Sequence, residues 1–264
     1  MKSITVFTII ITLCGLMAMA YWNAYGKYDI PMSLKYERVK DIPPPTGFSR
    51  QVVVDNSFAA FLRNIPLKQD NNAVYLYNGE LKGNQDAQFS VIKMEVGKKD
   101  LQQCADAVMR LRAEYLYAQE RYDDIHFNYV SDSKPRYFET EMKGDHSRAA
   151  FEKYLETTFN YANTLSLKNE LKPVTLDKMQ IGDVFIKSGN PYGHAMIVID
   201  MAVNTANGKK MFMLAQSYMP AQEIHIVKNP TDSEISPWYP SDFVGWIITP
   251  EYLMTDNDLR RFKD

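Results

Sequence analysis

Two kinds of hydrophobic periodicity divide the chain. Between residues 100 and 167, apolar side chains recur every three or four positions, which is typical of helices that bury one face. After residue 178 the apolar residues alternate or run together in short segments separated by Gly, Asn and Pro, which is typical of strands and turns. Helices followed by strands predict an α+β fold, in which an antiparallel sheet packs against a helical half.

The helical half is predicted to begin at Asp100. Asp100 as the N-cap and Gln103 three residues later match a capping box, in which two side chains satisfy free backbone N–H groups reciprocally. Cys104 then falls in the first turn, on an apolar stripe that continues through Val108 and Leu111. The pattern therefore places a cysteine at the start of a helix.

Further elements are expected on both sides of this helix. Ser57 is a suitable N-cap for a short helix over 57–65, and a hairpin of strands is expected over 72–97. A second amphipathic helix is expected over 146–167, and the tail, 256–264, is interpreted as a short helix or a frayed end. Strands are expected at 182–187, 194–203, 210–219, 223–228 and 243–249.

Residues 122–143 have no clear period and are interpreted as a long surface excursion. The segment is polar and aromatic, and long loops of this kind often form the walls of binding sites. Tyr129 and Tyr137 could form such a wall, and the alternative is that they only pack the loop down.

The first twenty residues have the pattern of a signal peptide. Lys2 is followed by an apolar or small run over 4–20, which closes on Ala18-Met19-Ala20, the small side chains that signal peptidase requires. Cleavage before Tyr21 is expected, which predicts a protein exported to the periplasm or cell envelope.

Two alternatives would leave the N-terminus associated with the membrane. A run of roughly 17 apolar residues is near the lower limit for an uncleaved anchor. Cys14 also permits a lipoprotein, although bulky Leu13 stands before it where a small residue is expected. We therefore divide the chain into a signal peptide (1–20), a tether (21–50) that contains "DIPPPTGFSR", and a single α+β domain (51–264).

Charge and motifs exclude several classes of function. The net charge is −2, and the basic residues form no stripe of the kind that binds nucleic acid. No Gly-rich phosphate loop and no metal-ligand spacing of His, Cys and Asp occurs in the sequence. We therefore expect no nucleic-acid partner, no cofactor and no metal.

Cys104 is the one cysteine left when the signal peptide is removed, so it has no partner for an internal disulfide. Free N–H groups and aligned peptide dipoles at a helix start favour an anion, and a nearby imidazolium favours it further. The thiol pKa is thus expected to lie well below its usual value of about 8.5, as a nucleophile requires. The alternative is a buried, inert thiol on the apolar stripe.

His194 is the best candidate for the partner of Cys104. It opens a strand that is apolar on both faces, so its ring should be held rigidly. His126 and His146 lie in or beside the polar excursion, and His225 alternates toward the expected solvent face. The alternative is a strand-end histidine that faces water.

The order of these motifs resembles the papain-like NlpC-type cysteine peptidases and amidases. The shared features are the helix-start Cys104, then "GDVFI", a short turn and "GHAMIVID". The chain from about residue 43 onward also resembles an uncharacterised exported bacterial family, domain of unknown function 4846, through "QQCADAVMRLRAEYLY" and "LAQSYMPAQEIHI". The first resemblance implies an antiparallel sheet against the cysteine helix, and the second implies no known activity.

The NlpC-type resemblance implies a catalytic pair and a third polar residue. Cys104 would be the nucleophile and His194 the base. The third residue, which orients the histidine, is not obvious in this sequence, and Gln216 is the candidate because a loop centred near Ala206 would place it on the His194 face. A change of one residue in strand register would present Ser217 instead. Gln102 or a backbone N–H near Cys104 could stabilise an oxyanion, and Asp183 is expected to shape the Gly-Asp turn. The sequence departs from the family where Gln103 and Ala105 flank the cysteine.

The function expected from these residues is that of an exported cysteine hydrolase. It would cleave an amide or peptide bond, and the resemblance points to peptides derived from the cell wall. The main alternative is a binding module without catalysis on the same scaffold, and a second is a tethered structural component of the envelope. The departures around Cys104 favour the alternatives, whereas the lone cysteine with a Gly-His strand favours the enzyme.

Overall fold

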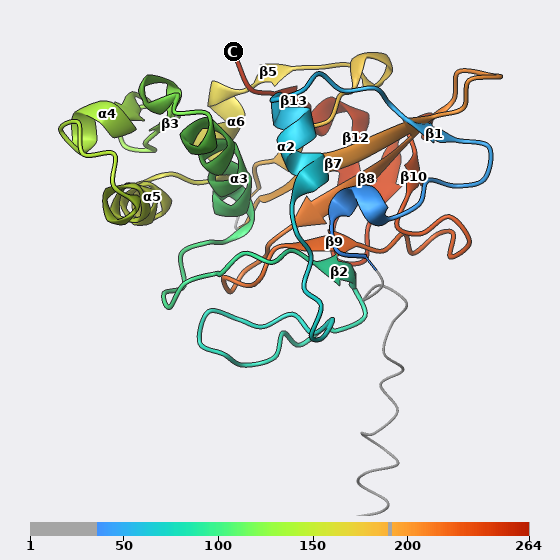
Figure 1. Ribbon diagram of the computed structural model, residues 1–264, viewed down its shortest axis with the longest axis horizontal. Helices are drawn as coiled ribbons and strands as arrows, with labels where there is room; N and C mark the ends of the chain where they lie inside the picture. Colours follow the sequence, from blue (N-terminus) through green and yellow to red (C-terminus); the bar gives the residue numbers. More distant parts are fainter. Residues whose placement is uncertain (1–35, 190–191, 264) are drawn as a thin grey trace, which may run out of the picture. The chain divides into compact units, whose positions relative to one another are not determined.

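An antiparallel sheet of nine strands organises the part of the chain that the computed structural model describes, residues 36–189 and 192–263 (Figure 1). Its main path runs β2 (Gln88–Val91), β9 (His225–Val227), β8 (Lys210–Gln216), β7 (His194–Val203), β6 (Val184–Lys187), β13 (Leu259–Arg261) and β5 (Lys172–Pro173). In addition, β1 (Ser49–Arg50) pairs with β7 and β10 (Tyr239–Pro240) pairs with β8. The α+β class with an antiparallel sheet is confirmed.

The remaining elements are short hairpins and helices. One hairpin joins β3 (His126–Asn128) to β4 (Pro135–Tyr137), and the other joins β11 (Trp246–Ile248) to β12 (Leu253–Thr255). The α-helices are α2 (Phe58–Asn64), α3 (Cys104–Ala118), α4 (Phe138–Glu141), α5 (Arg148–Tyr161) and α6 (Thr164–Glu170). The 3-10 turns are η2 (Val39–Asp41), η3 (Tyr122–Asp124), η4 (Leu176–Lys178) and η5 (Asp256–Asp258).

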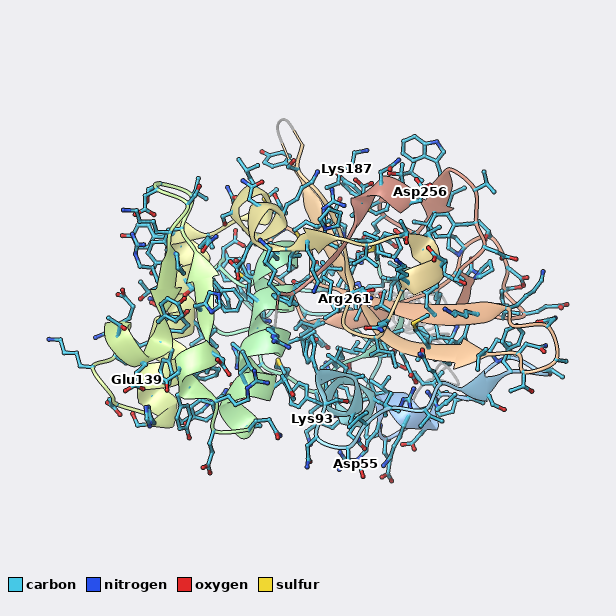
Figure 2. All side chains as sticks on the ribbon, turned by 90° about the horizontal axis from the view of Figure 1, so that it is seen from above. Asp55, Lys93, Glu139, Lys187, Asp256 and Arg261 are labelled. Atoms are coloured by element: carbon cyan, nitrogen blue, oxygen red, sulfur yellow. The ribbon has the colours of Figure 1, made fainter. Side chains whose placement is uncertain are left out.

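Strand β7 is buried on both faces, as its continuous apolar sequence predicts. Ala195, Ile197 and Ile199 point into the core that includes the apolar face of α3. Met196 and Val198 point into a second core on the opposite face. Figure 1 shows α2 and α3 against the sheet, with α4 and α5 beyond α3. In the view from above, Glu139 marks the outer end of this helical side, whereas Arg261 lies over the sheet (Figure 2).

The fold begins earlier than residue 51, so the last part of the expected tether belongs to it. Val39 and Ile42 are buried, and β1 pairs with the far end of β7. Arg50 forms an ion pair with the buried carboxylate of Asp200, which also accepts hydrogen bonds from Arg63 at 2.7 and 2.9 Å. The expected signal peptide, residues 1–20, lies outside the described residues. No helix within 36–189 and 192–263 is long and apolar enough to cross a bilayer.

Helix α3 begins at Cys104 and not at Asp100. Its N-cap is Gln103, whose backbone N–H donates to the Asp106 carboxylate at 3.0 Å. The Asp100 carboxylate instead accepts from the Gln103 side chain and from the backbone N–H of Ala221, at 3.1 and 2.7 Å. The expected capping residue thus ties the segment before the helix to a loop of the sheet, and Cys104 becomes the first helical residue.

Several other expectations are corrected. The predicted hairpin over 72–97 does not form, because β2 pairs with β9. The expected helix over 146–167 is two helices, since the Asn163 side chain caps a new start with hydrogen bonds to the N–H groups of Leu165 and Ser166. The excursion over 122–143 is ordered, because buried Phe127 and Phe138 anchor it. The tail forms β13, a strand inside the sheet.

Candidate active site

His194 and Gln216 form the centre of the candidate site. His194 opens β7 and Gln216 closes β8, so the antiparallel pairing of these strands brings both side chains to one end of the sheet. The His194 Nε2 lies 2.8 Å from the Gln216 Oε1, and both residues are buried. Because an amide oxygen only accepts, the Nε2 must carry the proton. The Nδ1 is then unprotonated in the neutral ring, where it can act as a base.

The orientation of the Gln216 amide is fixed from behind. Its nitrogen donates to the Glu251 carboxylate at 2.8 Å and lies 3.3 Å from the His225 Nε2. The His225 Nδ1 donates to the backbone carbonyl of Glu223 at 3.0 Å, which leaves the His225 Nε2 as an acceptor. Two acceptors therefore hold the amide nitrogen, and the oxygen is left to face His194.

Glu251 is held by a buried cation. The Lys82 ammonium lies 2.8 Å from one carboxylate oxygen of Glu251 and donates to the other at 2.9 Å. Burial lowers the pKa of Lys82, whereas the hydrogen bond and charge of Glu251 raise it. The chain of contacts from Lys82 through Glu251 and Gln216 to His194 is thus continuous. The ion pair between Lys82 and Glu251, at the end of the network away from His194, makes the network rigid.

Two aromatic rings enclose His194. The rings of Tyr218 and Tyr252 each have their centroid 4.8 Å from the imidazole. His194 is 1% exposed, and this burial lowers its pKa to about 4, although the bond to Gln216 acts in the opposite sense. The imidazole is therefore neutral at physiological pH.

Cys104 and His194 line one pocket of about 290 Å³ at the end of the sheet. The peptide N–H of Ala195, the residue after His194, lies close enough to the Cys104 sulfur to stabilise a thiolate. Burial, and then the Cys104 sulfur, raise the pKa of Tyr252, whose ring also contacts His194. The start of α3 is therefore next to the start of β7. Within the described chain, however, no hydrogen bond joins the sulfur to the imidazole.

The expected low pKa of Cys104 is not found. The side chain is 9% exposed, and burial raises the pKa of the thiol to about 11. Backbone N–H groups of Ala195, Ala105 and Cys104 oppose this, and the charge of Asp106 adds to it. Loss of hydration outweighs the helix start, so the resting pair is a neutral thiol beside a neutral imidazole.

Ser217 has a structural position and not the one that the alternative register would give it. Its hydroxyl is within 2.9 Å of the Gln102 carbonyl and 2.8 Å of the Gln222 carbonyl. It therefore connects the segment before Cys104 to the end of β8. The Gln102 side chain is buried and outside the pocket lining, and its Oε1 accepts from Arg110 at 3.3 Å.

Other residues singled out in the sequence lie away from the pocket. The Asp183 carboxylate accepts from the backbone N–H of Gln180 at 2.8 Å and pairs with Arg261, as expected of a turn residue. Tyr129 packs on Tyr161, and Tyr137 packs on His126.

Tyr129 and Tyr137 thus do not line the pocket, and its aromatic residues come from other parts of the chain. These residues are Phe159, Tyr192, Tyr218 and Tyr252.

Three parts of the site had no distinct signal in the sequence. His225 was expected to face solvent but is fully buried against Gln216. Glu251 and Lys82 are far apart in the chain and stand in no motif. Their roles depend on the tertiary fold, and His225 is buried because β9 is covered on both faces.

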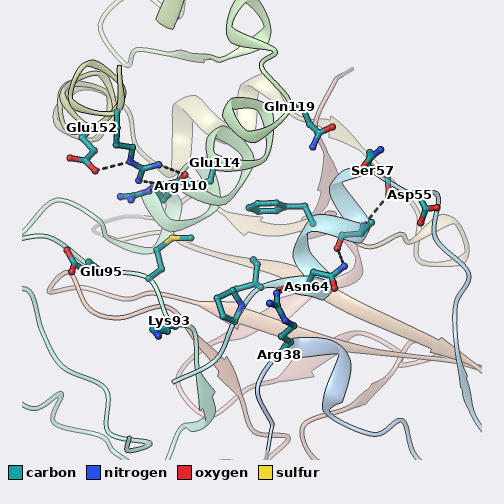
Figure 3. A pocket seen from close by; sticks show the side chains of 17 residues that line it. Arg38, Asp55, Ser57, Asn64, Lys93, Glu95, Arg110, Glu114, Gln119 and Glu152 are labelled. Carbon is teal, nitrogen blue, oxygen red and sulfur yellow. Dashed lines mark hydrogen bonds and ion pairs between the residues drawn. The ribbon is translucent and has the colours of Figure 1, made fainter. Parts of the chain in front are cut away.

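A wider cavity, of about 940 Å³, lies elsewhere (Figure 3). Four of the charged side chains that line it pair with one another. Glu114 pairs with Arg110 and Arg148, and Arg148 also pairs with Glu152. None of the described residues that line it is a cysteine or a histidine, so it holds neither member of the candidate pair. Throughout residues 36–189 and 192–263, no group of His, Cys, Asp and Glu side chains is arranged to hold a metal ion.

A family model described as domain of unknown function (4846) matches residues 39–261, which include Cys104, His194 and Gln216. No curated protein and no solved structure matches the chain. The resemblance to NlpC-type enzymes therefore gains no support from these comparisons.

Proposed function

The chain belongs to the family of domain of unknown function 4846, and we propose that it is an exported, papain-like cysteine hydrolase that cleaves an amide or peptide bond. The observation that carries this proposal is the hydrogen bond from the His194 Nε2 to Gln216. It leaves the Nδ1 as the basic atom of a ring that shares a pocket with the only thiol in the described chain.

The proposed reaction begins with proton transfer from the Cys104 thiol to the His194 Nδ1. The sulfur then forms a bond to the substrate carbonyl carbon, and the carbonyl oxygen becomes an oxyanion. Helix α3 begins at Cys104, so the backbone N–H of this residue has no helical acceptor and is suited to donate to that oxygen. The imidazolium then gives its proton to the leaving amine as the C–N bond breaks. Water hydrolyses the resulting thioester and restores the thiol.

The neutral resting pair determines how the nucleophile is generated. With the thiol pKa raised to about 11 and the imidazole pKa lowered to about 4, the ion pair is unfavourable without substrate. Proton transfer must therefore accompany attack on the carbonyl, and His194 acts as a general base in that step. We place peptides derived from the cell wall first among the substrates, because an exported hydrolase would meet them.

The burial of Cys104 favours a second candidate, a binding module without catalysis. A thiol that is 9% exposed, with its pKa raised by burial, is also what an inert core cysteine shows. In that case the aromatic pocket would bind a ligand, and Cys104 would only fill space.

One experiment separates the two functions. The purified protein is incubated with soluble cell-wall peptides, and new amino termini are followed by mass spectrometry. The hydrolase predicts turnover that is lost in both Cys104→Ala and His194→Ala. The binding module predicts no turnover, together with peptide binding that Cys104→Ala leaves unchanged.

A further inference from the structure

Asp106 is a buried carboxylate beside the candidate nucleophile. It is the third residue of α3, is 6% exposed and lines the pocket that Cys104 and His194 share. Its Oδ2 accepts the backbone N–H of Gln103 at 3.0 Å and so caps the helix. Its Oδ1 has no hydrogen-bond partner among the described residues. Capping therefore uses one oxygen and leaves the other unused.

An unused carboxylate oxygen is unfavourable in a buried site. Loss of hydration without a replacement donor costs about 1–3 kcal/mol for a polar group and more for a charged one. Burial accordingly raises the pKa of Asp106 well above its ordinary value. A ligand that donates a hydrogen bond and carries positive charge would remove this cost.

The rest of the pocket suits a cation. Among the described residues that line it, none is Lys or Arg, and Asp106 is the one acidic residue. Its aromatic residues, which include Tyr192, Tyr218 and Tyr252, can present ring faces or hydroxyl oxygens to an ammonium group. The pocket thus combines one buried acceptor with an aromatic wall.

We propose that Asp106 is a specificity residue that holds a positively charged amino group of the substrate beside the Cys104 sulfur. As a statement about the substrate, this rests on the proposed hydrolase function. The position of Asp106 also connects binding to chemistry, because its charge raises the pKa of the Cys104 thiol. An ammonium group bound there would offset that charge and favour the thiolate.

The test uses thiol reagents of similar size and different charge. The reagents are 2-aminoethyl, ethyl and 2-sulfonatoethyl methanethiosulfonate, which are cationic, neutral and anionic. They are applied to the full chain carrying Cys14→Ser, in which Cys104 is the remaining thiol. Modification rates are measured by intact-mass spectrometry and divided by the rates with a small free thiol. We expect the cationic reagent to exceed the anionic one by at least about tenfold.

Two matched variants show whether Asp106 causes this preference. Asp106→Asn keeps the shape and the cap and should bring the ratio close to that of the free thiol. Asp55→Asn makes the same change at an exposed carboxylate outside the pocket and should leave the ratio unaltered. If Asp106→Asn does not fold, Asp106→Glu replaces it as the test, because the retained charge should preserve the preference.

Three results would overturn the proposal. These are equal normalised rates for cation and anion, a preference that survives in Asp106→Asn, and no modification of the folded protein by any reagent. Turnover of cell-wall peptides without a charge preference would leave the hydrolase in place and remove the ammonium site. A charge preference without turnover would leave the ammonium site in place and remove the hydrolase function.

Discussion

The amide nitrogen of Gln216 lies 2.8 Å from a carboxylate oxygen of Glu251, which is itself paired with the buried ammonium of Lys82. This contact decides which end of the amide faces His194. Glu251 therefore influences which nitrogen of the His194 imidazole is protonated, although the two residues are connected through Gln216.

Glu251→Gln should lower turnover more than it lowers binding. The substituted amide can present either end to Gln216, so the His194 Nε2 loses its fixed acceptor. Outer partners of this kind typically change activity by about 10- to 100-fold when they orient a reactive residue. We expect kcat for cell-wall peptides to fall in that range and KM to change little.

The control for Glu251→Gln deals with stability. The substitution leaves Lys82 without its ion-pair partner, and breaking a buried pair typically costs about 3–5 kcal/mol. The double variant Lys82→Met with Glu251→Gln removes this unpaired charge and should recover much of the melting temperature. Recovery of activity along with stability would contradict an orienting role for Glu251.

The pH dependence of alkylation tests the neutral resting state of Cys104. With the thiol pKa raised to about 11 by burial, iodoacetamide should react slowly at neutral pH. The rate should rise about tenfold per pH unit until the thiol titrates, because the thiolate is the reactive form. Unfolding in denaturant should speed the reaction at pH 7, since a free thiol has a pKa of about 8.5.

His194→Ala is the matched variant for this measurement. A neutral imidazole contributes no charge to the thiol, so the variant should keep the steep pH dependence. A fast, flat rate between pH 5 and 8 that His194→Ala abolishes would instead indicate a thiolate–imidazolium pair.

The sequence was sufficient for the parts of the site that follow local rules. Continuous apolar residues predicted β7 as a buried strand. The order of β7 and β8 predicted that Gln216 or, in the other register, Ser217 would face His194, and the structure has Gln216 there. The helix periodicity placed Cys104 in a first turn, although three residues of the expected start are not helical.

Long-range pairing explains what the sequence did not reveal. In β13, Leu259 pairs with Phe185 of β6, and a strand of three residues is too short to show a period. His225 was assigned to a solvent face because it alternates with Ile224 and Ile226. The structure covers both faces of β9, so alternation there carries no information about exposure. The thiol pKa was predicted from the helix start alone, whereas burial determines it.

Buried neutral histidines predict a loss of stability in acid. Burial lowers the pKa of His194 to about 4, so the unfolded chain binds a proton below its own pKa of about 6.5 when the folded protein does not. The contribution of His194 is thus complete above pH 6.5 and is lost as the pH falls toward 4. The corresponding slope is about 1.4 kcal/mol per pH unit for one proton.

The comparison of the parent protein with His194→Gln isolates this effect. Glu170 titrates in the opposite sense, because burial raises its pKa to about 7, so the slope of one protein alone is not diagnostic. The free energy of unfolding is measured in urea between pH 7 and pH 4.5. It should fall more steeply with pH in the parent protein than in the variant, and the difference in slope should correspond to about one bound proton. Equal slopes would mean that His194 is charged in the folded protein.

Gln216→Ala and Ser217→Ala should separate orientation of the base from positioning of the backbone. The Gln216 Oε1 accepts a hydrogen bond from the His194 Nε2–H at 2.8 Å, so truncation of Gln216 frees the imidazole ring. Proton transfer by a positioned side chain typically contributes about 10²- to 10⁴-fold to the rate, and we expect the lower part of that range to be lost from kcat.

The Ser217 hydroxyl instead lies within hydrogen-bond distance of the backbone carbonyls of Gln102 and Gln222. The hydroxyl has one proton and donates to one of these carbonyls at a time, so its loss leaves one buried acceptor without that donor and should cost about 1–3 kcal/mol of unfolding free energy. Gln216→Ala also leaves buried partners of the amide without Gln216, so both variants should melt earlier, and the loss of kcat should be larger in Gln216→Ala than in Ser217→Ala. The opposite order would assign the orienting role to Ser217.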